Sequence, residues 1–229
     1  MRRVDINGHP GNAAADGVDE TWVMNPAARQ GDPAAYDGAM PAVANVREYL
    51  VAMPTTVADL AKRVAARRAT GTPAVVRICP GAAGHGYPLE AWAVSPIPEF
   101  CEREELSVAV DFGNIAYYPW SEIVAFARTY PRLAVIALAT PLGGPTAMRA
   151  LDATPNLVFD TSGIATAADL TAFAELVRTC GAYRVAFGSG IAKTKPAELA
   201  RVLSAADAAT VFLETAAHLD VGTWASEFL

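Results

Sequence analysis

The sequence predicts a (β/α)8 barrel, the TIM-barrel fold, as one compact domain over residues 1–229. Short apolar runs alternate with stretches of helical periodicity, which is the pattern of βα units that build a parallel sheet. Eight such runs occur, the number that closes a barrel, and 229 residues lie near the short end of the range for this fold. Several runs, such as 108–110 and 133–136, are apolar on both faces, as strands covered on both sides must be.

The predicted strands are short runs rich in β-branched and other apolar residues, bounded by turn residues. They cover Val4–Asn7, Thr21–Asn25, Tyr49–Met53, Ala74–Cys79, Leu106–Phe112, Leu133–Ala139, Asn156–Asp160 and Tyr183–Phe187. The alternative architecture is an open doubly wound sheet. It is disfavoured because no Gly-x-Gly-x-x-Gly turn follows the first strand to bind a dinucleotide.

Segments between the strands have the apolar spacing of amphipathic helices. The spacing is carried by Val57, Leu60, Ala61 and Val64, by Leu170, Phe173, Ala174 and Val177, and by Leu199, Val202 and Leu203. Pro196 stands where a first-turn proline is tolerated. The sequence Ser-Gly-Ile-Ala occurs at 162–165 and again at 189–192, each time between a strand and a helix. Either a duplication or the preference of tight βα turns for Ser and Gly accounts for it.

Composition and charge exclude several classes of partner. The chain has 18 Lys and Arg against 24 Asp and Glu, a net charge of −6, and no basic run interleaved with aromatic residues, so a nucleic-acid partner is not expected. Arg63, Arg67 and Arg68 cluster on a predicted helix face that we expect to be exposed to solvent.

Cysteine usage and the lack of apolar segments predict the compartment. The three cysteines are far apart and odd in number, which indicates a reducing environment rather than a disulfide framework. No apolar signal region follows the first residues, and no stretch is long enough to span a bilayer. We therefore expect a cytoplasmic protein with no membrane partner; a homo-oligomer is left open.

Polar residues at the carboxyl ends of the predicted strands are the candidates for chemistry, because in a barrel these ends share one mouth. Arg77, Asp111 and Asp160 lie at the carboxyl ends of the fourth, fifth and seventh predicted strands. An arginine on an apolar strand requires a carboxylate or a bound anion. Arg77 is therefore interpreted either as an anion clamp or as the ion-pair partner of Asp111. Asn7 and His9 share one strand parity, so both are predicted to point into the mouth if that parity faces inward.

Four short motifs resemble the amidohydrolase-related family of barrel metal-dependent hydrolases and decarboxylases. They are, in order, Asp5-Ile6-Asn7-Gly8-His9, Val76-Arg77-Ile78-Cys79-Pro80, Phe159-Asp160-Thr161-Ser162-Gly163 and Phe187-Gly188-Ser189-Gly190. The resemblance implies a divalent metal held by two histidines of strand one, histidines of strands five and six, and an aspartate of strand eight. The chain departs from that pattern: Asn7 replaces the first histidine, Asp111 falls in the strand-five region, and Gly190 stands where the aspartate is expected. Of the implied ligands only His9 remains.

A catalytic zinc ion takes three protein ligands, which this set does not supply, so no metal ligand and no cofactor are predicted. A weak oxygen-rich site for a magnesium-type ion, built from Asp5, Asp111 and Asp160, stays as the alternative.

The predicted function is hydrolysis or decarboxylation of a small anionic molecule by a divergent, metal-depleted relative of that family. His9 acts as general acid or base, Arg77 fixes a carboxylate, and Asp111 orients one of them. Asn7 and Asp160 are predicted to contact the ligand.

Two other functions are compatible with the sequence. One is a non-catalytic ligand-binding or scaffold barrel, a pseudoenzyme. The other is an isomerase or lyase with a phosphate ligand, because barrels bind phosphate at the last two βα loops through small residues and helix N-termini. Ser162, Ser189 and Gly190 are the predicted binding residues in that case.

Overall fold

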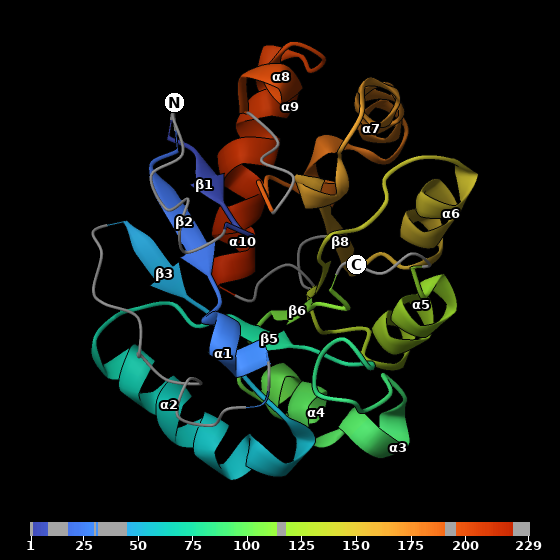
Figure 1. The fold of residues 1–229 in the computed structure, drawn as a ribbon. Helices are drawn as coiled ribbons and strands as arrows, with labels where there is room; N and C mark the ends of the chain where they lie inside the picture. The colour runs from blue at the N-terminus through green and yellow to red at the C-terminus, as the bar shows by residue number, and fades with distance from the viewer. Residues whose placement is uncertain are drawn as a thin grey trace.

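The computed structural model describes residues 2–8, 18–29, 31, 45–113, 118–190 and 196–221. Parallel strands form two hydrogen-bonded sheets, of order β1-β2-β3 and β4-β5-β6-β7-β8-β9. The strands are Val4–Asp5 (β1), Glu20–Val23 (β2), Val46–Glu48 (β3), Leu50–Val51 (β4), Val76–Ile78 (β5), Val108–Val110 (β6), Val135–Ala137 (β7), Leu157–Asp160 (β8) and Val185–Ala186 (β9). Figure 1 shows β5, β6 and β8 near the centre and β1, β2 and β3 toward one side.

Backbone hydrogen bonds join the two sheets into one ring. β3 and β4 are parts of a single strand: the amide of Tyr49 donates to Val23 on one side (2.8 Å), and the amide of Leu50 donates to Val75 on the other (3.1 Å). At the opposite seam, the amide of Ile6 donates to the carbonyl of Phe187 over 2.8 Å. The strands therefore number eight in spatial order along the chain, and the predicted (β/α)8 barrel is confirmed.

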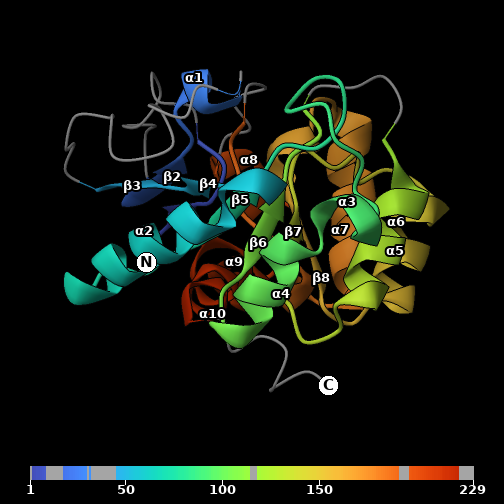
Figure 2. The same cartoon turned by 90° about the horizontal axis from the view of Figure 1, so that it is seen from below.

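Helices lie around the strands, most of them on the outer side of the six-stranded sheet (Figures 1 and 2). They are α1 (Pro26–Arg29), α2 (Val57–Ala69), α3 (Ala91–Val94), α4 (Pro96–Arg103), α5 (Trp120–Thr129), α6 (Pro145–Ala153), α7 (Ala167–Cys180), α8 (Pro196–Ala200), α9 (Ala205–Ala209) and α10 (Thr215–Val221). Short 3-10 turns occur at Pro54–Thr56, Thr161–Gly163 and Ala182–Arg184, and Thr210–Glu214 is a π-helix. None of these described helices is long and apolar enough to cross a membrane.

Two apolar layers follow from the alternation of side chains along each strand. Outward-facing residues such as Val76, Val108 and Phe159 pack against the helices. Inward-facing residues such as Ala109 and Val158 fill the barrel together with Ala216 and Leu219 of α10. The hydroxyl of Ser107, just before β6, donates to the carbonyl of Leu219 over 2.7 Å, so α10 closes the amino-terminal end of the barrel.

Four details differ from the sequence-based predictions. The third strand begins at Val46 rather than at Tyr49, and Tyr183 belongs to a 3-10 turn rather than to the last strand. α8 ends at Ala200, so the spacing through Val202 and Leu203 runs beyond the helix. Arg63 is buried and donates to the carbonyl of Val51 over 2.8 Å, because its guanidinium satisfies a backbone group at the end of β4.

Gly163, at the end of the turn after β8, allows the backbones of neighbouring loops to touch. A Cβ atom there would overlap the carbonyl oxygen of Thr140, which is backbone and cannot turn away. We expect Gly163→Ala to lower the free energy of unfolding by about 2 kcal/mol. Gly143→Ala is the control, because its nearest heavy atom would lie 3.8 Å away. Equal melting temperatures for the two variants would contradict this prediction.

Candidate functional site at the barrel mouth

The polar residues predicted from the strand ends converge inside the barrel at its carboxyl-terminal end. Arg77, Asp111 and Asp160 continue the inward-facing rows of Val75, Ala109 and Val158, and all three are buried. Asn7 reaches the same place from the turn after β1. The structure therefore brings together side chains from strands that are far apart in the sequence.

Arg77 and Asp111 form a buried ion pair across β5 and β6. The guanidinium donates through Nε to Asp111 Oδ2 over 3.1 Å and also through Nη2. Burial alone would raise the pKa of Asp111, but Arg77 and Arg29 outweigh it and hold the pKa at about 2. Burial likewise opposes the charge of Arg77, and the Asp111 carboxylate more than offsets it, so the arginine pKa is raised. Asp111 Oδ1 also accepts a hydrogen bond from the amide of Gly113 over 2.7 Å, so the same carboxylate pairs with Arg77 and stabilises the turn after β6.

Arg29 is a second cation on the same carboxylate, and the sequence analysis missed it. It is the last residue of α1, and its Nη2 pairs with Asp111 Oδ2, the oxygen that Arg77 also uses. α1 lies over the mouth (Figures 1 and 2). The three side chains together carry a net charge of one positive unit.

Asn7, Asp160 and Ser162 form a buried hydrogen-bond network next to Arg77. Asn7 Nδ2 donates to Asp160 Oδ2 over 2.8 Å and to Ser162 Oγ over 2.9 Å, and Ser162 Oγ donates to Asp160 Oδ2 over 2.6 Å. Asn7 Oδ1 accepts from Arg77 Nη1 over 3.2 Å, so the asparagine connects the ion pair to this network. Gly188 leaves room for the Asp160 carboxylate of this network, since a Cβ atom at Gly188 would lie 2.6 Å from Asp160 Oδ2.

Asp160 has a pKa well above the ordinary value of an aspartate. Burial raises it from 3.8 to about 6, against hydrogen bonds from Ser162, Asn7 and the amide of Ala139 that lower it. A carboxyl that titrates near pH 6 can both give and accept a proton under ordinary conditions, as general acid–base chemistry requires.

The Ser189-Gly190 turn does not have the role that the phosphate hypothesis predicts for it. The amide and hydroxyl of Ser189 donate to Asp5 over 2.9 and 2.6 Å, and the amide of Gly190 donates to the carbonyl of Asn7 over 2.8 Å. Ser162 and Ser189 thus each face a carboxylate, which would repel phosphate. Burial raises the pKa of Asp5, opposed by these bonds from Ser189.

His9 is the residue predicted to act as acid or base at the mouth. His9 lies outside the described residues, so its predicted role stays a prediction. His85, on the loop after β5, donates through Nε2 to the carbonyl of Ala28 over 2.7 Å and thereby fixes α1 over the mouth. Cys79 is fully buried, and burial raises its pKa to about 12, as expected for a packing residue.

The metal that the family resemblance implies does not fit the described donors. All six carboxylate oxygens of Asp5, Asp111 and Asp160 accept hydrogen bonds from the protein. The guanidinium of Arg77 lies among these groups, where its charge would repel a divalent cation. No group of three His, Cys, Asp or Glu side chains within the described ranges is placed to hold a metal ion. The weak magnesium site of Asp5, Asp111 and Asp160 is therefore not supported.

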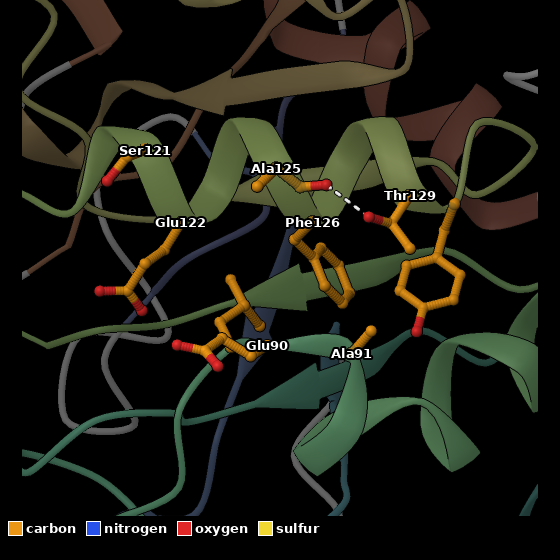
Figure 3. Close-up of a pocket in the computed structure, with 9 residues that line it drawn as sticks. Glu90, Ala91, Ser121, Glu122, Ala125, Phe126 and Thr129 are labelled. Carbon is orange, nitrogen blue, oxygen red and sulfur yellow. Dashed lines mark hydrogen bonds between the residues drawn. The ribbon is translucent and has the colours of Figure 1, made fainter.

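A groove of about 300 Å³ lies on the outside of the barrel, between α5 and the segment that begins α3 (Figure 3). Its walls include Leu89, Ala91 and Phe126, and the carboxylates of Glu90 and Glu122 lie at the same end. Two carboxylates without a nearby arginine or lysine among its lining residues make this groove unsuitable for an anion. The mouth is therefore the candidate site.

Comparisons with known proteins support the fold. No family model matches the chain, and no curated protein does. The chain is similar to the solved structure of a dihydroorotase from Campylobacter jejuni, with 13% identity over 95% of this chain and 82% of that one and a TM-score of 0.60. It is also similar to a 2,6-dihydroxybenzoate decarboxylase from Rhizobium, with 13% identity over 96% of this chain and 98% of that one and a TM-score of 0.59. A third similar structure is a 5-carboxyvanillate decarboxylase from Sphingomonas paucimobilis, with 14% identity over 92% of this chain and 81% of that one and a TM-score of 0.60. At these identities the likeness shows the fold alone, that of a TIM barrel.

Proposed function

We propose that the barrel mouth binds a small carboxylate and catalyses its decarboxylation or hydrolysis without a tightly held metal ion. The observation that carries the proposal is the shared counter-ion at the mouth, because Arg29 and Arg77 both pair with Oδ2 of Asp111 and the side chain of Arg29 stays partly exposed. A guanidinium group that shares its counter-ion and remains accessible can bind an anion, and guanidinium groups bind carboxylates with particular geometric fit. Two solved structures of similar fold are decarboxylases, one of 2,6-dihydroxybenzoate and one of 5-carboxyvanillate.

The proposed roles follow from the contacts. Arg77 supplies positive potential beneath the ligand, and Asp111 orients it. Asp160, with its pKa near 6, is a group that can exchange a proton with the reacting atoms. His9 keeps its sequence-based role as a second acid or base. In a decarboxylation the bond to the carboxylate carbon breaks, carbon dioxide leaves, and the remaining carbon takes up a proton.

A non-catalytic barrel is the second candidate, and one observation favours it. Asp160 is fully buried and each of its oxygens already accepts a hydrogen bond, so the network is stable without a substrate. Both candidates predict carboxylate binding, and only the first predicts product. Incubation with 2,6-dihydroxybenzoate and chromatography for resorcinol tests turnover of one such compound.

Carboxylate binding is tested by thermal unfolding with 2,6-dihydroxybenzoate, benzoate and citrate, each against a neutral amide or ester analogue. A ligand that binds only the native state stabilises it by about 2.7 kcal/mol at one hundred times its dissociation constant. We expect at least one carboxylate to raise the melting temperature and its neutral analogue to have no effect. Equal effects of acid and analogue, or no effect of any acid, would contradict the proposal.

A further inference from the structure

The two arginines of the mouth differ in how many of their donors are already used. Arg77 donates through Nε and Nη2 to Asp111 and through Nη1 to Asn7, and its side chain is 6% exposed. Arg29 pairs with Asp111 through Nη2, and its side chain is 26% exposed. A ligand can therefore reach the guanidinium of Arg29 without breaking the contacts of Arg77.

The backbone of Arg29 is fixed over the mouth by contacts on two sides of α1. Ala28 is fully buried against Met24, Val51 and Cys79, a small apolar cluster at the ends of β2, β4 and β5. The carbonyl of the same residue accepts the hydrogen bond from His85. A short helix held in this way presents the arginine side chain at a defined place, although four residues alone would not be a stable helix.

Gly113 leaves room for the guanidinium of Arg29. A Cβ atom at this position would lie 2.6 Å from Arg29 Nη1, closer than two such atoms can approach. Gly113 also has a φ of 76°, a backbone conformation that L residues rarely adopt. The turn after β6 therefore both binds Asp111 through the Gly113 amide and accommodates Arg29.

We propose that Arg29 is the residue that receives the ligand carboxylate, and that Asp111 holds its guanidinium in position until the ligand arrives. The inference depends on the proposed function, because it names the anchor within that site. Asp111 Oδ2 is shared by two guanidinium groups, so a carboxylate that takes over Arg29 leaves Arg77 and Asp111 as a neutral pair. The ligand is accordingly a small molecule with one carboxylate directed at α1.

The test is calorimetric titration of 2,6-dihydroxybenzoate into the native protein and its variants. We expect Arg29→Gln to weaken binding by about tenfold or more, since a charge-assisted bidentate contact is lost. Arg29→Lys keeps the positive charge but lacks the planar guanidinium, and its affinity for the ligand should lie between those of the native protein and Arg29→Gln. Arg178→Gln is the matched control: it removes the same charge from a side chain that is 72% exposed and pairs with Glu175 on α7.

A second variant moves Arg29 without removing it. Gly113→Ala forces the guanidinium aside, and we expect weaker binding with the native circular dichroism spectrum retained. Its control is the neutral 2,6-dihydroxybenzamide, which we expect to give no binding heat with the native protein, Arg29→Gln or Gly113→Ala.

The outcomes separate this inference from the proposed function. Native affinity in Arg29→Gln with weaker binding in Arg77→Lys would place the carboxylate on Arg77, which overturns the inference and keeps the function. Unchanged affinity in both variants, or no binding to the native protein, would overturn both.

Discussion

Asp111→Ala is expected to lower the free energy of unfolding by about 3 to 5 kcal/mol, because it removes the carboxylate that binds the buried guanidinium of Arg77 directly. The guanidinium would keep the 3.2 Å hydrogen bond to Asn7 Oδ1 and its contact with the ring of Tyr49, 5.1 Å from the ring centre. Neither carries a negative charge. Equilibrium unfolding in urea at neutral pH measures the loss.

The two halves of the ion pair should not be equivalent. Arg77→Met is expected to cost less than Asp111→Ala, since Arg29 remains paired with the carboxylate. The double variant Arg77→Met with Asp111→Leu should be more stable than Asp111→Ala alone, because no buried charge is left unpaired. If Arg77→Met destabilised the protein as much as Asp111→Ala, Arg29 would not be neutralising the charge of Asp111. The inference that Arg29 and Arg77 share Asp111 as their counter-ion would then be wrong.

The strands could be predicted from the sequence because burial on both faces leaves a local signal. Runs such as 108–110 and 135–137 are apolar at every position, and no other element of this length requires that. The first half of the third strand escaped prediction because Val46, Arg47 and Glu48 are only partly buried. Arg47 is held instead by ion pairs with Glu20 and Asp220, which depend on the tertiary fold.

The site was predictable only where strand parity determines it. Arg77 and Asp111 lie on adjacent strands with the same inward parity, so their contact follows from the register. Arg29 lies 82 residues from Asp111 in the chain, on a four-residue helix with no periodicity, and no local pattern marks it. The Ser-Gly turns were identified, but the carboxylates that Ser162 and Ser189 bind come from other parts of the barrel, which a turn sequence cannot reveal.

Between about pH 4 and pH 6 we expect the free energy of unfolding to fall as the pH rises, because of Asp160. Its pKa is about 6 in the folded protein against an ordinary 3.8, so the native state binds this proton more tightly than the unfolded chain does. The stabilisation is fully present below pH 4 and is lost as the pH rises through 6. At about 1.4 kcal/mol per pKa unit it amounts to about 3 kcal/mol.

Asp111 has the opposite effect in a lower range. Its pKa of about 2 means that its stabilisation is complete above pH 4 and is lost as the pH falls toward 2. The two carboxyls together place the maximum stability near pH 4, below the range of about 5 to 8 in which proteins are usually most stable. Urea unfolding at intervals from pH 3 to pH 8 would show this maximum.

Asp160→Asn isolates the contribution of the one carboxyl, since asparagine does not titrate. We expect the variant to lose most of the decline between pH 4 and pH 6, while Glu122→Gln, on the outer groove, keeps it. A native protein whose stability rises from pH 4 to pH 6 would show that Asp160 is ionised with little cost. Such a carboxyl would have no proton to give near neutrality, so the same measurement decides whether Asp160 can act as the acid in the proposed reaction.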